Sequence, residues 1–359
     1  MRQPIFLGLR PDKDSKEVTK EIPLLKGRKK QHMNTNSNDK NDIVSDQRDI
    51  IKKIGKNEVK LTNVDKVYWK KEGYTKGDVI NYYHKIAPYI LPYLKDRPHS
   101  LNRHPNGING KSFYQKDVEG KVPEWIKTHA DFSESNNKTI HYFVCRDEAS
   151  LLYMVNLGCI EIHPWHSVIA TPDNPDYCLI DLDPLEIGFD KVVETALTVK
   201  EVLNELDIRS YPKTSGATGI HIYIPLGGMY HYNESRLIAQ IIATEVHRRM
   251  PSITSIERSP AKRRRKVYID YLQNRQGQTI AAPYSIRPRP KAAVSTPLHW
   301  DEVKKGLVPE KYTIETIFDR IKTEGEIFSP ILKKSAITKK HIQSFQNIDK
   351  AITNTILID

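Results

Sequence analysis

Cys178-Leu179-Ile180-Asp181-Leu182-Asp183-Pro184 is the stretch that decides the fold. A β-strand alternates its side chains between two faces, so Asp181 and Asp183 are expected together on the face opposite Ile180. Two neighbouring carboxylates repel each other, and a divalent cation held between them relieves the repulsion. Pro184 has no N–H for a ladder and predicts that the acids lie at a strand end. Two solvated carboxylates on an exposed strand are the other interpretation of Asp-x-Asp.

The length and composition of the chain predict a soluble intracellular protein. Its 359 residues are enough for two domains, or for one large domain with an extra segment. The three cysteines form no C-x-x-C pair and lie in apolar or mixed runs, so they are predicted to be reduced core residues. The sequence contains neither a run of 18 apolar residues nor an apolar signal core at its N-terminus.

The formal net charge of +12 favours a polyanionic partner. Five cationic residues follow one another at 262–266, directly before a predicted strand that carries an acid. Such a run is also typical of a solvated segment. A membrane surface is the less favoured polyanion, because the sequence contains no basic amphipathic helix with a bulky apolar face.

Two further stretches carry groups suited to a nucleotide. Ser215-Gly216-Ala217-Thr218-Gly219-Ile220-His221 has two glycines for a close backbone approach, hydroxyls, and a strand histidine. Taken alone, this stretch is compatible with an ordinary turn. Val267 to Tyr271 alternates as a strand that sets Asp270 apart from its apolar residues, and 160–166 alternates as a strand with Glu161 and His163 on one face.

These stretches together predict a site for phosphoryl transfer. Three acids on strand faces, two of them paired, suit two metal ions ~3.5–4 Å apart. The charge of a triphosphate also needs cationic or hydrogen-bond-donating groups, for which Arg287, His221 and Ser215 are the candidates.

The order of these motifs resembles the archaeo-eukaryotic primase superfamily, and within it the polymerase domain of the bacterial ligase D family. The resemblance covers about 59–327. It is carried by Asp181-Leu182-Asp183-Pro184, Ser215-Gly216-x-x-Gly219-x-His221, Val267-x-Ile269-Asp270-Tyr271-x-Gln273-Asn274, Leu61-Thr62-Asn63, Gly73-Tyr74-Thr75-Lys76, Arg103-x-Pro105-Asn106-Gly107 and Ala282-Pro283-Tyr284-Ser285-x-Arg287. One difference is Thr218, where many relatives have Lys; another is Asn102, which is basic in some relatives.

The resemblance implies a role for each matching residue. Asp181, Asp183 and Asp270 would ligate two Mn²⁺ or Mg²⁺ ions. The nucleotide-binding set would be Phe113, Tyr114, Lys116, His163, Ser215, Gly216, Thr218, Gly219, His221, Gln273 and Arg287, with Phe113 or Tyr114 stacking on the base. Asn63, Lys66 and Lys76 would hold the 5′-phosphate of a DNA gap or end, and Arg103, Lys262 and Arg263 would contact DNA.

The predicted fold class is α+β, a primase-like catalytic core with a central, mainly antiparallel sheet flanked by helices, plus an N-terminal α/β part. Residues 58–330 form the primase-polymerase domain, and 331–359 form a C-terminal tail. The Lys-, Asn- and Asp-rich residues 26–57 read as a flexible linker. Residues 1–25 resemble the end of the OB-fold domain of a DNA ligase from the same family. The nucleophilic lysine motif of a ligase is absent from the sequence, so no ligation is expected.

The predicted function is primer extension by attack of a 3′-hydroxyl on the α-phosphorus of an NTP or dNTP. The resemblance implies a preference for ribonucleotides, DNA ends or gaps with a 5′-phosphate as substrate, Ku and a DNA ligase domain as partners, and a nucleoid-associated place in the cytoplasm. Three alternatives stay open. They are a metal-dependent phosphodiesterase, a non-catalytic DNA-end-binding module and, with less support, an Asp-x-Asp glycosyltransferase.

Overall fold

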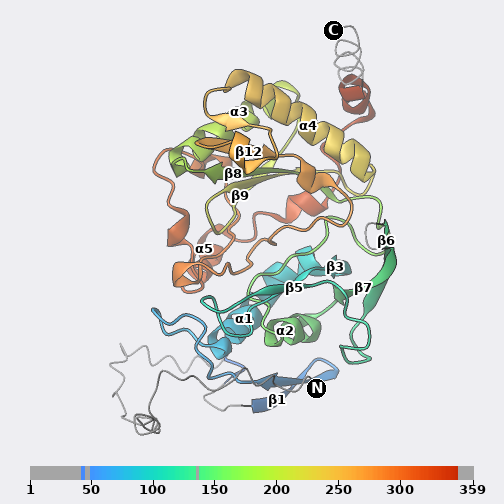
Figure 1. The fold of residues 1–359 in the computed structure, drawn as a ribbon, viewed down its shortest axis with the longest axis vertical. Coiled ribbons are helices and arrows are strands. Elements are labelled where there is room, and N and C mark those ends of the chain that lie inside the picture. Colours follow the sequence, from blue (N-terminus) through green and yellow to red (C-terminus); the bar gives the residue numbers. More distant parts are fainter. Residues whose placement is uncertain (1–41, 45–48, 135–136, 347–359) are drawn as a thin grey trace, which may run out of the picture. The chain divides into compact units, whose positions relative to one another are not determined.

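The computed structural model of this protein describes residues 42–44, 49–134 and 137–346 (Figure 1). The ligase-like segment expected at 1–25 and most of the linker expected at 26–57 lie outside the described residues. None of the helices in the described part is long and apolar enough to cross a membrane.

A five-stranded sheet in the order β11-β12-β8-β10-β9 is the largest sheet that the structure describes. All neighbouring strands are antiparallel except β11 and β12. The mainly antiparallel sheet of the predicted α+β fold is therefore confirmed. Its strands are β8 (Tyr177–Leu185), β9 (Tyr211–Thr214), β10 (Ile220–Pro225), β11 (Thr254–Ser255) and β12 (Lys266–Asp270).

In the described part of the chain, three smaller antiparallel sheets, the five α-helices labelled in Figure 1 and a helical segment at 339–346 complete the fold. The smaller sheets are β1 (Asp49–Ile54) with β2 (Asn57–Thr62), β4 (Leu101–Arg103) with β5 (Phe113–Gln115), and β3 (Arg97–His99), β7 (Lys138–Cys145) and β6 (Thr128–Ser133). The helices are α1 (Lys76–Leu94), α2 (Glu148–Asn156), α3 (Phe189–Glu205), α4 (Tyr232–Arg249) and α5 (Ile317–Glu324).

The two faces of the large sheet contribute to two different hydrophobic cores. Cys178, Ile180 and Leu182 of β8 pack with the apolar residues of α3 and α4, which cover this face (Figure 1). Leu179 of β8 and Tyr223 of β10 point to the other face and join the core that contains α1 and α2. The alternation predicted for β8 is thus confirmed. It leaves Asp181 and Asp183 on the face away from α3 and α4.

Two predictions about element boundaries were wrong. β8 runs past Pro184 to Leu185, because beyond Leu182 it pairs with β12 alone and the missing N–H of Pro184 costs no ladder bond. Residues 160–166 form isolated bridges instead of a strand, and all of them are buried. Pro88 and Pro92 lie inside α1, where burial of residues such as Ile90 stabilises the helix to Leu94.

The structure also differs from the predicted domain limits at 58 and 330. β1 begins at Asp49, inside the segment predicted to be a linker, and pairs along its whole length with β2. In the segment predicted to be a tail, Ile342 and Phe345 are buried in the core of α3 and α4. Both segments contain few apolar residues, but these residues pack against a neighbouring strand or helix and so extend the folded domain.

Candidate active site

Four polar side chains lie in one row across four strands of the large sheet. The register places Asp181 of β8 opposite both Asp270 of β12 and His221 of β10, and His221 opposite Lys213 of β9. Directly opposed residues share a face, so the row runs Asp270, Asp181, His221, Lys213. The convergence of Asp270 with Asp181, which lies 89 positions earlier in the sequence numbering, follows from the β8–β12 pairing.

Asp183 lies one pleat beyond this row, opposite Tyr268 of β12. The Tyr268 hydroxyl donates to Oδ1 of Asp270 at 3.2 Å, and the backbone N–H of Leu272 donates to the same oxygen at 2.8 Å. Both bonds engage Oδ1, so an ion can use Oδ2. The guanidinium of Arg263 stacks on the Tyr268 ring at 3.7 Å from its centroid and brings a cation to the edge of the acids.

The electrostatics of the three acids favour a bound cation. Burial, together with the negative charges of Asp270 and Asp183, raises the pKa of Asp181 to about 8. Partial burial likewise raises the pKa of Asp183 and of Asp270. Carboxylates whose charges are mutually unfavourable are the ligands that Mg²⁺ and Mn²⁺ prefer, so the residues present fit such ions.

His221 connects the acids to the cationic side of the row. Its Nε2 lies 3.4 Å from Oδ1 of Asp181, and its Nδ1 lies 2.8 Å from Nζ of Lys213. Burial, and then the positive charges of Lys213 and Arg287, hold the pKa of His221 well below its usual range. The imidazole is therefore neutral and can donate from one ring nitrogen only.

The glycine-rich loop that precedes His221 is closed by its own serine. Oγ of Ser215 accepts the N–H groups of Ala217 at 3.1 Å and Gly219 at 3.0 Å, which leaves its hydroxyl hydrogen for another acceptor. A Cβ on Gly219 would lie 2.2 Å from the carbonyl oxygen of Leu182, so only glycine allows this approach to β8. At Gly216, φ is +72°, and a Cβ would lie 2.8 Å from Cγ of Arg287.

A buried carboxylate positions Arg287 beside this loop. Nε of Arg287 donates to Glu161 at 2.7 Å, and its Nη1 donates to the carbonyl of Ser215 at 2.7 Å. Glu161 also accepts from Asn102 and lies 3.3 Å from Nε2 of His163. Burial alone would raise the pKa of Glu161, but His163, Arg287 and Asn102 outweigh it and hold the pKa well below its usual range. Glu161 is thus an anion that fixes two predicted nucleotide ligands.

Aromatic side chains border the site on the β5 side. Phe113 and Tyr114 are exposed large aromatic residues, and the Tyr114 ring lies 6.5 Å from the ring of His163. Arg103 lies 5.3 Å from the centre of the Phe113 ring and donates to the Leu157 carbonyl and to Gln115. Exposed aromatic rings beside cations are suited to stacking on a base.

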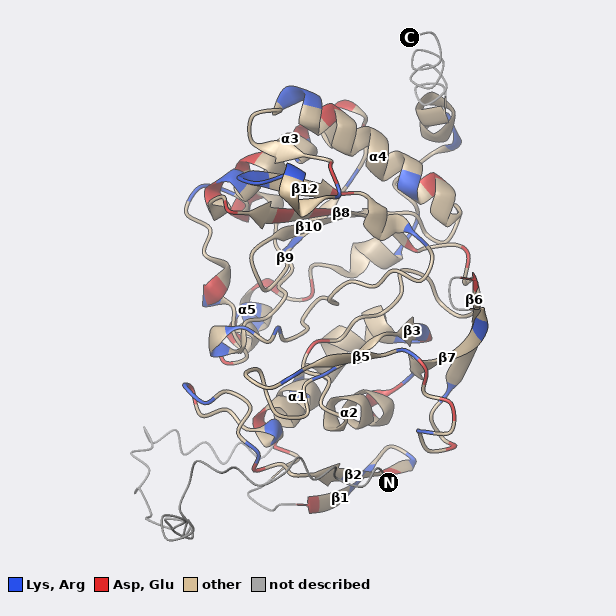
Figure 2. Cartoon of the chain, in the orientation of Figure 1, with Lys and Arg blue, Asp and Glu red and all other residues tan. Residues whose placement is uncertain are grey.

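On the opposite side, Asp270 and Gln273 line a cavity of about 300 Å³ together with Arg258, Arg263, Tyr268, Leu272, Arg275 and Gln278. Figure 2 shows Lys and Arg gathered in the segment that leads into β12, which contains Arg263. The acids therefore have cations on both sides, Arg263 at one and Arg287 at the other.

Comparison with known families decides what this arrangement is. The family model of the LigD primase-polymerase domain matches residues 75–328, which contain every strand of the large sheet. The chain belongs to this family. Its members are nucleotidyltransferases, and the three acids, the Ser215 to His221 loop and Arg287 all lie inside the matched range.

Two named relatives and one solved structure support membership of this family. The chain is 36% identical over 270 residues to the bifunctional non-homologous end joining protein LigD of Bacillus subtilis, covering 74% of this chain and 43% of that protein. It is 29% identical over 287 residues to the multifunctional LigD of Mycolicibacterium smegmatis, covering 79% and 37%. The chain thus spans less than half the length of these relatives. The solved polymerase domain of Mycobacterium tuberculosis ligase D, in complex with DNA, superposes with a TM-score of 0.71 at 25% identity, covering 77% of this chain and 99% of that one.

The residues predicted to hold a 5′-phosphate lie around the start of α1. Asn63 has a φ of +52°, and its carbonyl accepts the N–H of Lys66, whose own carbonyl accepts the N–H of Lys76. Lys76 begins α1 after the cap Thr75, and its Nζ donates to the Thr62 carbonyl at 2.6 Å and to Asn156 at 2.8 Å. Burial, and then the charge of Lys66, lowers the pKa of Lys76 to about 8. Clustered cations at a helix N-terminus suit an anion.

Three residues of the predicted set stand apart from these contacts. Lys116, Thr218 and Lys262 are exposed, and their side chains form no hydrogen bond with another residue in the described part of the chain. Exposed lysines and threonines still suit a bound polyanion, so their roles remain predictions. Lys213 was missed altogether, although a register that pairs its strand with β10 would have placed it beside His221.

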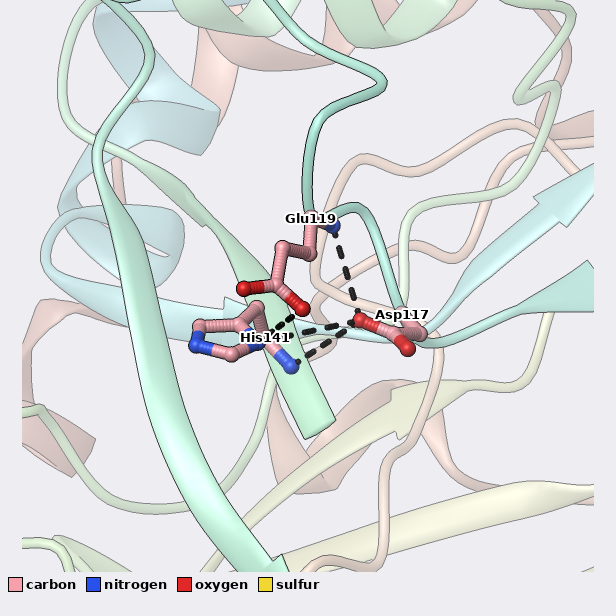
Figure 3. Close-up of side chains that lie close together, drawn as sticks. All are labelled: Asp117, Glu119 and His141. Atoms are coloured by element: carbon pink, nitrogen blue, oxygen red, sulfur yellow. Dashed lines mark hydrogen bonds and ion pairs between the residues drawn. The ribbon is translucent and has the colours of Figure 1, made fainter. Parts of the chain in front are cut away.

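A second group of ligand-type residues combines the segment that follows β5, which carries Asp117 and Glu119, with His141 on β7. The ligand atoms of Asp117, Glu119 and His141 lie within 4.8 Å of one another, so the group could hold a metal ion (Figure 3). Oδ1 of Asp117 already accepts the backbone N–H groups of Glu119 and His141, and Nζ of Lys138 lies 3.5 Å from Oδ2. The backbone hydrogen bonds and Lys138 therefore engage only Asp117 of this group, and Nδ1 of His141 has no hydrogen-bond partner among the described residues.

Proposed function

We propose that this protein extends a primer strand at DNA ends and gaps, by attack of the 3′-hydroxyl on the α-phosphorus of an NTP or dNTP with release of pyrophosphate. The single observation that carries the proposal is the row of Asp270, Asp181 and His221 across three paired strands, with Asp183 one pleat away. It brings acids and a neutral donor to one face of the sheet. The reaction needs no side-chain nucleophile.

Asp181, Asp183 and Asp270 would hold two divalent cations, Mg²⁺ or Mn²⁺. Bound there, the cations would neutralise charge on the phosphate oxygens and make the 3′-hydroxyl more acidic. The chain itself orients the nucleotide. Arg287, fixed by Glu161, and the hydroxyl of Ser215 would bind phosphate oxygens, and Phe113 or Tyr114 would stack on the base.

The biological setting is proposed from the relatives. Those compared above carry names that place them in non-homologous end joining, and the solved polymerase domain is a complex with DNA. We infer the same setting for this chain, with Ku and a DNA ligase domain as partners and a preference for ribonucleotides. The cations at Lys66, Lys76, Arg103, Lys262 and Arg263 supply the charge for DNA.

Primer extension on gapped DNA tests the proposal. The substrate carries or lacks a 5′-phosphate at the gap, and NTPs are compared with dNTPs in Mn²⁺ and in Mg²⁺. We expect template-directed addition, faster with NTPs and with the 5′-phosphate. Shortening of the labelled strand without nucleotide would identify a phosphodiesterase instead. Metal-independent binding without any extension would identify an end-binding module.

The preference for a 5′-phosphate should depend on pH through Lys76. A bound phosphate favours the charged ammonium, whose pKa of about 8 in the free protein means that the charge is lost as the pH rises through 8. Between pH 7 and pH 9 the ratio of Kd values for 5′-hydroxyl and 5′-phosphate gaps should fall by roughly fivefold. Fluorescence anisotropy at constant ionic strength measures this ratio. A ratio that is flat over this range would show that Lys76 does not contact the phosphate.

A further inference from the structure

The cluster of Asp117, Glu119 and His141 lies outside the proposed catalytic row, and the proposed reaction gives it no role. Two of its side chains follow β5 and the third lies on β7, so the cluster joins two segments of the chain (Figure 3). Nδ1 of His141 is shielded from solvent and has no hydrogen-bond partner in the described part of the chain. A buried polar atom without a partner is costly, so this nitrogen needs an explanation.

The three ligand atoms surround a point instead of bonding to one another. Nδ1 of His141 lies 3.3 Å from Oε2 of Glu119 and 4.0 Å from Oδ1 of Asp117, yet it forms a hydrogen bond with neither. At 3.3 Å the Glu119 oxygen is close enough, so it must lie off the direction in which a ring N–H would point. Ligands ~2.1 Å from a tetrahedral ion lie roughly 3.4 Å apart, so a small contraction would seat one ion between the three.

The backbone holds the Asp117 carboxylate in place for such an ion. Its Oδ1 accepts the N–H of His141 at 3.2 Å, and the N–H of Val118 donates to the His141 carbonyl at 2.9 Å. Carboxylates that bind metals are fixed by hydrogen bonds of this kind, which orient the ligand. Nζ of Lys138 lies 3.5 Å from Oδ2 of Asp117, but this side chain is 56% exposed, so it can turn into water at little cost.

The chemistry of the ligand set distinguishes between metal ions. Mg²⁺ and Ca²⁺ prefer oxygen ligands alone, which suits the three acids of the large sheet. An imidazole nitrogen together with two carboxylates suits Zn²⁺, which commonly takes three protein ligands and a water molecule. Glu119 is mostly exposed and the His141 ring is partly exposed, so an ion can enter from solvent.

We propose that Asp117, Glu119 and His141 bind one Zn²⁺, which fastens the segment after β5 to β7. The ion would accept the lone pair of Nδ1 and bring together two carboxylates that otherwise face each other across the histidine. Binding of Zn²⁺ does not depend on the proposed function.

The consequence for the nucleotide does rest on the proposed function. Gln115 of β5 donates to the carbonyl of Asp117 at 3.3 Å and accepts from Arg103, which lies beside the Phe113 ring. β5 pairs only with the three-residue strand β4, so it has few contacts of its own. A fixed Asp117 would therefore steady the strand that carries Phe113 and Tyr114, the proposed base-stacking residues.

Isothermal titration calorimetry of the whole chain with Zn²⁺ tests the site, in excess Mg²⁺ to occupy the acids of the large sheet. We expect one Zn²⁺ per wild-type chain. His141→Gln and Asp117→Asn should each weaken the binding by at least about 100-fold. Lys138→Met removes a competing cation and should strengthen it, and His129→Gln, on the neighbouring strand β6, is the matched control with wild-type affinity. Absence of Zn²⁺ binding by wild type, or a Kd unchanged in both His141→Gln and Asp117→Asn, would overturn the inference.

Hydrogen exchange and primer extension test what the ion does. Zn²⁺ should slow amide exchange at 113–119 in wild type and leave it unchanged in His141→Gln. In primer extension, Zn²⁺ equimolar with the protein should lower KM for the nucleotide by about threefold in wild type alone, with kcat constant. Exchange that stays the same when Zn²⁺ binds would overturn the fastening role. A wild-type protein that binds Zn²⁺ but extends no primer would refute the proposed function and leave the metal site standing.

Discussion

Asp181→Asn should abolish primer extension and at the same time stabilise the metal-free protein. Loss of one of the three carboxylates that would hold the proposed cations is expected to lower kcat by at least about 10³-fold. The stability effect has the opposite sign because the side chain keeps its size and loses an unfavourable charge. In the wild-type protein, the folded-state pKa of Asp181 is about 8, far above the ordinary value of 3.8 for an aspartate.

The sign of the stability effect follows from proton binding. Between pH 3.8 and pH 8 the folded protein holds a proton at Asp181 that the unfolded chain has released, so the contribution to stability is complete at acid pH and is lost as the pH rises through 8. Asparagine has no such dependence, and at pH 8 the variant should gain up to about 5 kcal/mol in the free energy of unfolding.

Urea denaturation in EDTA at pH 5 and pH 8 measures this gain, which should be smaller at pH 5. Asp190→Asn, which changes an exposed aspartate in the first turn of α3, is the control. Its primer extension should equal that of wild type, and its free energy of unfolding should change by no more than a few tenths of a kcal/mol. A variant that is both inactive and less stable than wild type would mean that Asp181 supports the fold, and retained extension would remove it from the catalytic set.

The sequence was sufficient to predict the strand that carries Asp181 and Asp183 and the face that these acids share with Asp270. Alternation in β8 and β12 and the order of the motifs predicted that Asp181, Asp183 and Asp270 share a face, and the β8–β12 register places them there. Local alternation works for these strands because each has one face in a continuous apolar core.

The supporting contacts were beyond the sequence because they depend on pairing between distant segments. Nothing near Lys213 in the chain indicates that its strand lies beside β10, and a buried lysine runs against its ordinary preference for water. Glu161 was expected on a strand face with His163, yet 160–166 is not a strand. Its place beside Arg287 instead arises from isolated bridges and from the hydrogen bond between Ser285 and the backbone of Ile162.

Arg287→Met should lower kcat/KM for the nucleotide by about 10²-fold or more and should also destabilise the protein. The activity loss follows from removal of a fixed cation beside the Ser215 loop. The stability loss arises because Glu161 is buried and would lose the guanidinium that neutralises it. Removing one partner of a buried pair costs roughly 3–5 kcal/mol, and His163 and Asn102 should keep the loss at the lower end.

Glu161 allows the two effects to be separated. Glu161→Gln alone should reduce kcat/KM by about tenfold, because Arg287 loses its charged partner at 2.7 Å and is held less firmly. In Arg287→Met/Glu161→Gln the buried charge is absent, so stability should return to within about 1 kcal/mol of wild type while activity stays as low as in Arg287→Met.

This non-additivity distinguishes a positioning carboxylate from an independent catalytic one. If Glu161 acts through Arg287, its replacement has nothing further to remove once the guanidinium is gone. Unfolding in urea and primer extension on the four proteins complete the cycle, with Arg287→Lys as the test of geometry. Lysine restores the charge but cannot donate to Glu161 and Ser215 together, and it should recover little activity. Full activity in Arg287→Lys, or additive losses in the double variant, would contradict the role assigned to this pair.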